Sequence, residues 1–177
     1  MAHALPRLVP DALFPAYSFV PGRFPHPVSD PAGHSYGAVA PAAPVLVPER
    51  WADNLRYLFG IDLFNAGYYW EAHEAWESLW HVCGRTGRTA DFLKGLIKLA
   101  AAGVKVREDR PQGAAGHARA AADLFRRTGA PQERYLGLPL GELIDFAEAI
   151  ATDAPTATDP AAPVEIVFRF ALRPEQG

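Results

Sequence analysis

The sequence lacks the features that mark several large classes of protein. Its 177 residues include a single cysteine, Cys83, so no disulfide can form within the chain, as is typical of proteins in a reducing cytoplasm. No uncharged apolar run approaches the roughly 20 residues that a membrane helix needs. Residues 1–15 are interrupted by prolines and have no apolar core of the kind found in signal peptides. We therefore expect a cytoplasmic, prokaryotic protein with no membrane segment.

Basic residues are also too few for one large class of partner. The chain has 17 Lys and Arg against 20 Asp and Glu, which gives a formal net charge of −3. A surface that neutralises nucleic-acid phosphates needs an excess of positive charge, so we expect no nucleic-acid partner. With 49% hydrophobic and 21% charged residues, the composition is that of an ordinary globular chain rather than a disordered one.

Residues 1–48 differ in composition from the rest of the chain. They contain ten of the 17 prolines and only four charged side chains. Proline lacks an amide donor and fixes φ, which excludes a regular helix or a central strand here. The segment also has more aromatic side chains than a plain spacer needs: Phe14, Tyr17, Phe19, Phe24 and Tyr36. We predict that residues 1–48 form an extended arm on the domain surface, with a disordered tail as the alternative.

The hydrophobic pattern becomes helical at Pro48 and predicts one domain over residues 49–151. We expect helices at about 48–64, 68–83, 90–108, 111–127 and 139–150. Gly95 and Gly103 lower the helix propensity of the third, so we infer that another helix approaches closely there. The predicted fold class is all-α, an up-and-down bundle of four to five helices.

The C-terminal part is predicted to contain a linker and a strand. Residues 152–163 are rich in Pro, Ala and Thr and form the expected linker. In residues 164–177, the run VEIVFRFAL alternates Ile166, Phe168 and Phe170 with less apolar positions, which is a strand pattern. A strand needs a partner edge. We expect that edge in the arm, around residues 16–20 or 45–47, or in another copy of the chain.

The second predicted helix, YYWEAHEAWESLWHVC, combines a core face with a polar edge. At 100° per residue, His73 and Glu77 lie together at the border of its apolar side. Asp62 lies on the apolar side of the preceding helix, where a carboxylate needs a partner or an opening. We therefore expect Asp62, His73 and Glu77 to converge. The remaining polar positions and one tryptophan lie on the far side: Trp70, Glu71, Glu74, Ser78 and His81.

Two longer runs carry a family resemblance. FNAGYYWEAHEAWESLW and DFLKGLIKLAAAGVKVREDRPQGAAGHARAA contain an HExxE-x-x-W core at His73, Glu77 and Trp80, and a later Gly95-Leu96-Ile97. Together, over about residues 51–127, they resemble the domain-of-unknown-function family DUF309. The resemblance implies a small, prokaryotic, all-helical and often oligomeric protein. It implies no established activity.

The sharpest chemical interpretation is a metal site. His73 and Glu77 offer nitrogen and carboxylate ligands that suit zinc, manganese or iron, whereas His81 projects about 80° away from His73. The arm offers further ligands if it crosses this edge: His26, Asp30 and His34. Alternatively, Glu77 or Asp62 orients His73 as a general base without a metal. In the structural alternative, His73 is simply hydrogen-bonded and the arm histidines cap turns.

These patterns favour one function and leave a second open. We expect a non-enzymatic binding or assembly module, a homo-oligomer whose contact surface for a protein partner includes the arm and Trp70. The alternative is a small metal-dependent or acid–base enzyme, hydrolase-like, centred on His73 and Glu77. Lys94 and Lys98 are expected to pair across helices with the glutamates of the second helix.

Overall fold

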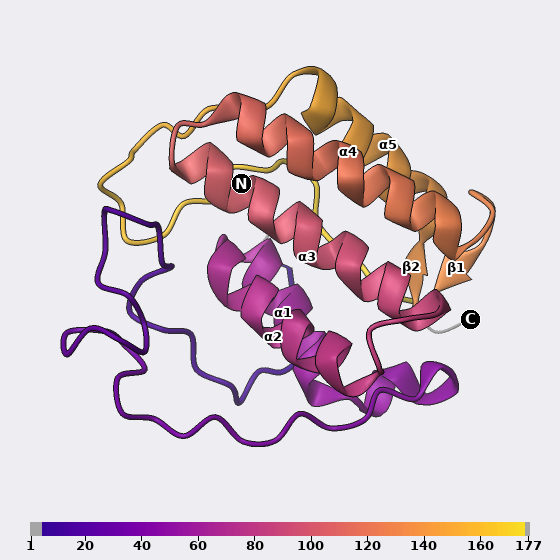
Figure 1. The fold of residues 1–177 in the computed structure, drawn as a ribbon, viewed down its shortest axis with the longest axis horizontal. Helices are drawn as coiled ribbons and strands as arrows, with labels where there is room; N and C mark the ends of the chain where they lie inside the picture. Colours follow the sequence, from indigo (N-terminus) through magenta and orange to yellow (C-terminus); the bar gives the residue numbers. More distant parts are fainter. Residues whose placement is uncertain (1–4, 176–177) are drawn as a thin grey trace.

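The computed structural model describes residues 5–175 of the chain, and in them the protein is a helical bundle (Figure 1). A short 3₁₀ helix precedes five α-helices, and a two-stranded antiparallel hairpin, β1–β2, precedes the last of them. The bounds are η1 Pro48–Asp53, α1 Leu55–Asn65, α2 Tyr69–Val82, α3 Arg88–Arg107, α4 Pro111–Thr128, β1 Arg134–Tyr135, β2 Leu138–Pro139 and α5 Leu140–Thr152. The predicted all-α fold class is confirmed.

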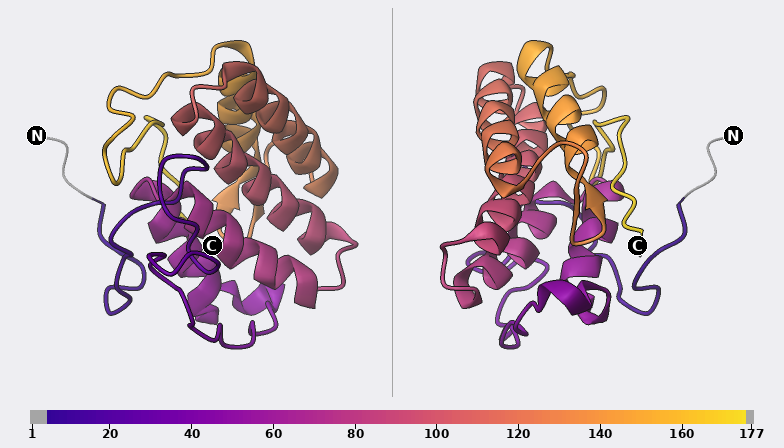
Figure 2. Two further views of the ribbon diagram at one scale, coloured as in Figure 1. Left: turned by 60° about the vertical axis from the view of Figure 1, so that its left-hand side comes forward. Right: turned by 90° about the vertical axis from the view of Figure 1, so that its right-hand side faces the viewer.

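The helices follow one another up and down the bundle. Each packs on the next, and α3, the longest, lies between the α1–α2 pair and the α4–α5 pair (Figure 1). None of the helices within residues 5–175 has the length and apolar character needed to cross a membrane. The arm, residues 5–47, has no regular secondary structure and runs along the outside of the α1–α2 pair (Figure 2).

The first predicted helix, 48–64, is divided in two. Its start forms the 3₁₀ helix η1, and Asn54 then adopts an extended conformation, with φ −87° and ψ 93°. The Asn54 side chain accepts a hydrogen bond from the amide of Tyr57, 2.9 Å away. Asparagine is among the strongest N-cap residues because it satisfies a free amide of the first turn. The division therefore follows from a cap within the predicted helix.

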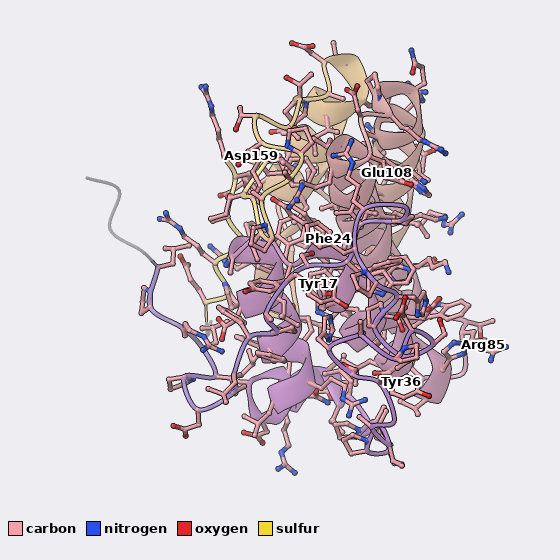
Figure 3. The ribbon with its side chains drawn as sticks, turned by 90° about the vertical axis from the view of Figure 1, so that its left-hand side faces the viewer. Tyr17, Phe24, Tyr36, Arg85, Glu108 and Asp159 are labelled. Carbon is pink, nitrogen blue, oxygen red and sulfur yellow. The ribbon has the colours of Figure 1, made fainter. Side chains whose placement is uncertain are left out.

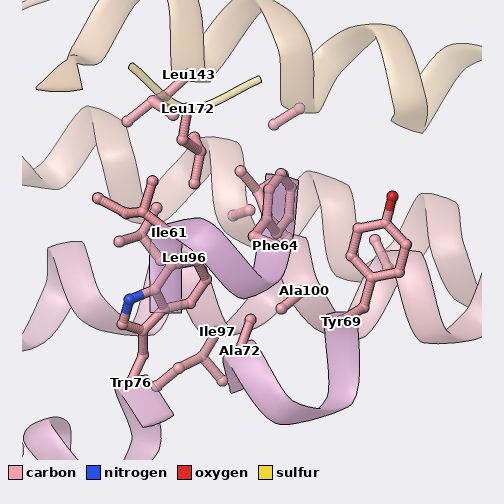
Figure 4. Packing of buried hydrophobic residues seen from close by; sticks show 14 of the residues in the cluster. Ile61, Phe64, Tyr69, Ala72, Trp76, Leu96, Ile97, Ala100, Leu143 and Leu172 are labelled. Carbon is pink, nitrogen blue, oxygen red and sulfur yellow. The ribbon is translucent and has the colours of Figure 1, made fainter. Parts of the chain in front are cut away.

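Two glycines of α3, Gly95 and Gly103, lie in close contact with neighbouring helices. Figure 4 shows part of the buried apolar core, with Tyr69 and Trp76 labelled. A Cβ at Gly103 would lie 2.5 Å from Cγ of Tyr69, and one at Gly95 would lie 2.5 Å from Cε1 of Phe125. The expectation of close approach at both positions is confirmed. The core around them is continuous and contains Trp76, whose side chain is fully buried.

The strand expected at 164–172 is an extended segment without sheet pairing. The Tyr69 hydroxyl accepts hydrogen bonds from the amides of Val167 and Phe168, at 3.0 and 3.3 Å. The side chain of Asn65 exchanges two 2.8 Å hydrogen bonds with the backbone of Leu172. Because side chains of α1 and α2 satisfy these backbone groups, the segment needs no partner strand in the arm. Ile166, one of the three apolar positions of that alternating pattern, is 61% exposed.

Candidate functional site

The polar edge of α2 brings together three groups that could hold a metal ion. His73, Glu74 and Glu77 each offer one ligand atom, and these atoms lie within 4.8 Å of one another. Positions i, i+1 and i+4 of one helix place the three side chains over the same turn. The His73 side chain is 22% exposed and that of Glu74 is 55% exposed, so the cluster faces solvent.

The contacts of this cluster leave one carboxylate available. His73 Nδ1 lies 3.2 Å from Glu74 Oε1, and the His73 ring stacks on Trp70 with centroids 5.7 Å apart. Within residues 5–175, the Glu77 carboxylate has no hydrogen-bond or ion-pair partner. A half-buried carboxylate without a partner is a good ligand for a cation, because the cation compensates its lost hydration.

Neighbouring helices contribute positive charge near the cluster. Burial lowers the pKa of His117, and the charges of Lys98, Lys105 and His73 lower it further. The expected pairing of Lys94 and Lys98 with the α2 glutamates is wrong for the described residues. Lys94 Nζ instead lies 4.1 Å from the centre of the Trp80 ring, a cation–π contact.

Asp62 is buried, and it binds the arm rather than His73. Its two oxygens accept hydrogen bonds from the amides of Leu8 and Val9, both at 2.8 Å, and Arg7 Nε lies 3.7 Å away. Its side chain is only 4% exposed. A carboxylate there must be paired, as the sequence indicated, but its partner is the backbone of the arm. The expected convergence with His73 and Glu77 is therefore not found.

Glu71 is a second buried anchor for the arm. We expected it on the solvent side of α2, yet it is 8% exposed because the arm covers it. Its oxygens contact Ser18 Oγ and the amide of Phe19, each at 2.9 Å, and Nε2 of His34 at 3.0 Å. No sequence signal identifies this role, because the path of an irregular segment cannot be read from periodicity.

The arm residues predicted as metal ligands are engaged elsewhere. His34 uses its second ring nitrogen to contact Ser35 Oγ at 2.9 Å. His26 Nδ1 accepts long hydrogen bonds from the two amides that follow Pro27, and Asp30 Oδ1 accepts one from Ala32 at 2.9 Å. The contacts of His26 and Asp30 cap turns, as the structural alternative expected of the arm histidines, whereas His34 contacts the side chains of Glu71 and Ser35. None of the three joins the His73 cluster.

Trp70, although on the polar side of α2, is covered by the arm. The ring of Phe19 meets the Trp70 ring edge-on, with centroids 4.8 Å apart. The centroid of the His26 ring lies 6.1 Å from that of Trp70. Figure 3 views this side of the molecule, where the labelled Tyr17, Phe24 and Tyr36 belong to the arm. The aromatic side chains of the arm thus pin it to the bundle.

Glu74 is the one member of the cluster that the sequence did not single out. Glu74 follows His73 by one residue, which rotates its side chain by about 100° around the helix axis. We therefore expected it on the far side of the helix. A glutamate side chain is long enough to reach back, and its hydrogen bond to His73 does so. Its position directly after His73 was the available signal.

Comparison with known proteins is informative for the central part of the chain. The search of curated proteins found no match. The family comparison matches residues 57–117, from α1 into α4, to the domain of unknown function DUF309. The matched range includes all three residues of the cluster and excludes the arm and α5. Residues 57–117 are thus similar to the DUF309 family, as the sequence predicted.

Proposed function

We propose that this protein is a binding module that holds one divalent transition-metal ion through His73, Glu74 and Glu77. The observation that carries the proposal is the approach of their ligand atoms to within 4.8 Å on a solvent-facing edge of α2. One imidazole and two carboxylates suit zinc, manganese or iron(II). Metal–ligand bonds of roughly 2.0–2.2 Å would require only small side-chain rotations from the present arrangement.

Three ligands from one helix would leave the ion with open coordination positions. An open position suits either a binding site completed by another molecule or a catalytic site. Exposure of Glu74 favours binding, because catalysis at a metal usually depends on a site that excludes water. A small metal-dependent or acid–base hydrolase centred on His73 and Glu77 is the second candidate, and the open coordination is the observation that favours it.

The partner we propose is a second copy of this chain. The outer side of the arm supports this, because Val39 and Val45 are 93% and 71% exposed. A chain of this size that keeps apolar side chains in water often uses them in contacts. The molar mass in solution, measured by light scattering with and without metal, tests this proposal. A wild-type dimer that Val39→Ser/Val45→Ser converts to a monomer would support it, and a monomer in both states would refute it.

The metal proposal is tested by calorimetric titration of the metal-free protein with zinc, manganese and iron(II). We expect one ion per chain, and loss of binding in His73→Ala and in Glu77→Gln. His81→Ala is the matched control, because His81 lies on the same helix, is exposed and contacts Arg85 instead. Absence of stoichiometric binding, or equal binding by His73→Ala, would refute the proposal.

The same samples separate binding from catalysis. The metal-loaded wild type and His73→Ala are compared on activated ester and phosphate substrates. Turnover that requires both the metal and His73 would favour the hydrolase-like alternative. Stoichiometric binding without turnover would favour the binding module.

A further inference from the structure

A cavity of about 420 Å³ lies where three parts of the chain meet, away from the His73 cluster. The β1–β2 hairpin, the first turn of α5 and the C-terminal segment form its walls, and none of these elements contributes to the cluster. Figure 1 shows this corner, with β1 and β2 beside the C-terminal end of the described chain. A volume in the range of about 300–1,000 Å³ suits a small molecule.

The floor of the cavity is apolar and already formed. Leu138 is 1% exposed and Leu143 is fully buried, so both are fixed by the core beneath them. Phe170 stacks on Phe146 with ring centroids 4.3 Å apart and planes 21° apart, which holds its ring in place. A preformed apolar floor means that a ligand loses little free energy to reorganisation of the site.

The rim of the cavity carries an excess of positive charge. Its charged residues are three arginines and two glutamates, which leaves one net positive charge in a chain whose net charge is −3. Arg134 is already paired with Glu175, 2.8 Å away, and donates to the carbonyl of Gly137. The lining therefore has two further guanidinium groups, Arg169 and Arg173, against one further carboxylate.

Arg169 and Arg173 are the groups available to a ligand. Among residues 5–175, neither has a hydrogen-bond or ion-pair partner, in contrast to Arg134. Both come from the segment that the side chains of α1 and α2 hold in place through Val167, Phe168 and Leu172. The amide of Glu175 also donates to the carbonyl of Gly137, 2.9 Å away. The backbone is thus held on both sides of each arginine, while their side chains line the cavity.

We propose that this cavity binds a small organic oxyanion, a carboxylate or phosphate group carried on an apolar body. Arg169 and Arg173 hold the oxyanion, because the planar guanidinium fork matches two oxygens at once. Pro139, Phe170 and Ala171 contact the apolar body, above the buried Leu138 and Leu143. The site is independent of the metal cluster, so either can exist without the other.

The test is calorimetric titration of the full chain at low salt with octanoate and, separately, with octyl phosphate. Octanamide is the neutral comparison, because it keeps the apolar chain and loses the negative charge. Arg169→Ala/Arg173→Ala removes the two proposed contacts from exposed positions, and far-ultraviolet circular dichroism checks that it folds. Arg110→Ala/Arg119→Ala is the matched control, since it removes the same charge from α4 and the turn before it.

We expect saturable binding of at least one of the two anions, weakened about tenfold or more in Arg169→Ala/Arg173→Ala and unchanged in the control variant. Tighter binding of octanoate identifies a carboxylate ligand, and tighter binding of octyl phosphate identifies a phosphate. Failure of both anions to bind, equal binding of octanamide, or equal losses in the two variants would overturn the proposal.

Discussion

Replacement of Glu71 by alanine should release the arm from the bundle. The Glu71 carboxylate contacts Ser18 Oγ, the Phe19 amide and His34 Nε2 at 2.9–3.0 Å in a site that is 8% exposed. Glu71→Ala removes all three contacts and leaves the amide and the imidazole without an acceptor. The arm must then either accept unpaired buried groups or move into water.

The expected loss in free energy of unfolding is about 3–5 kcal/mol, the range for breaking a buried charged network by removing one member. Each hydrogen bond to a charged group contributes roughly 1.5–3 kcal/mol, so the simple sum of three, about 4.5–9 kcal/mol, lies mostly above that range. The loss is smaller than the sum because a released arm recovers hydrogen bonds with water. The loss in free energy of unfolding therefore cannot exceed the free energy with which the arm docks on the bundle.

Two measurements on metal-free protein follow this change. Urea denaturation gives the global free energy of unfolding, and hydrogen exchange at the Phe19 amide reports opening of the arm alone. A local loss of about 3 kcal/mol corresponds to a roughly hundredfold faster exchange. Glu74→Ala is the control, because this neighbour is 55% exposed and should change stability by only about 0–1 kcal/mol. If Glu71→Ala resembled Glu74→Ala in both measurements, the anchoring role would be refuted.

Four further substitutions test helix packing, the core and the partly buried His117 of α4. Gly103→Ala should lower the free energy of unfolding by about 1–3 kcal/mol in urea, because its Cβ would lie 2.5 Å from the Tyr69 ring; Gly116→Ala, with open space around it, should instead raise it by up to about 1 kcal/mol. Trp76→Ala should cost about 3–5 kcal/mol in a thermal melt, because the side chain is fully buried. Burial lowers the pKa of His117 below 6.5, so the unfolded chain binds its proton more tightly. Lowering the pH through 6.5 should therefore destabilise wild type relative to His117→Gln in urea titrations, and parallel pH profiles would contradict this.

The helices could be predicted from the sequence because each has a periodic apolar face that packs on a neighbour. Gly95 and Gly103 even marked the places of closest approach. The C-terminal segment was different. Its alternating pattern describes an extended chain equally well whether another strand or side chains such as Tyr69 and Asn65 satisfy its backbone. A pattern of period two fixes the backbone conformation and leaves its partner undetermined.

The candidate site was predictable only where its residues share one helix. His73 and Glu77 lie together as the helical angle indicates, and Glu74 joins them. Asp62 and the arm residues could not be placed, because their positions depend on the path of an irregular segment. That path is set by two carboxylates, Asp62 and Glu71, whose partners include three backbone amides of the arm. Backbone amides occur at nearly every residue, so no sequence motif identifies them.

The arm anchors also have a consequence for the order of events during synthesis. The arm leaves the ribosome before the helices do, yet its acceptors on Asp62 and Glu71 lie more than 50 residues later. The backbone groups that Asn65 and Tyr69 bind lie about 100 residues after them, in the C-terminal segment. Contacts between distant residues form late because their loops cost entropy to close. The α1–α2 hairpin should therefore emerge before the arm and the C-terminal segment have packed on it. We expect a chaperone to bind the nascent chain during this interval, while the hairpin is uncovered.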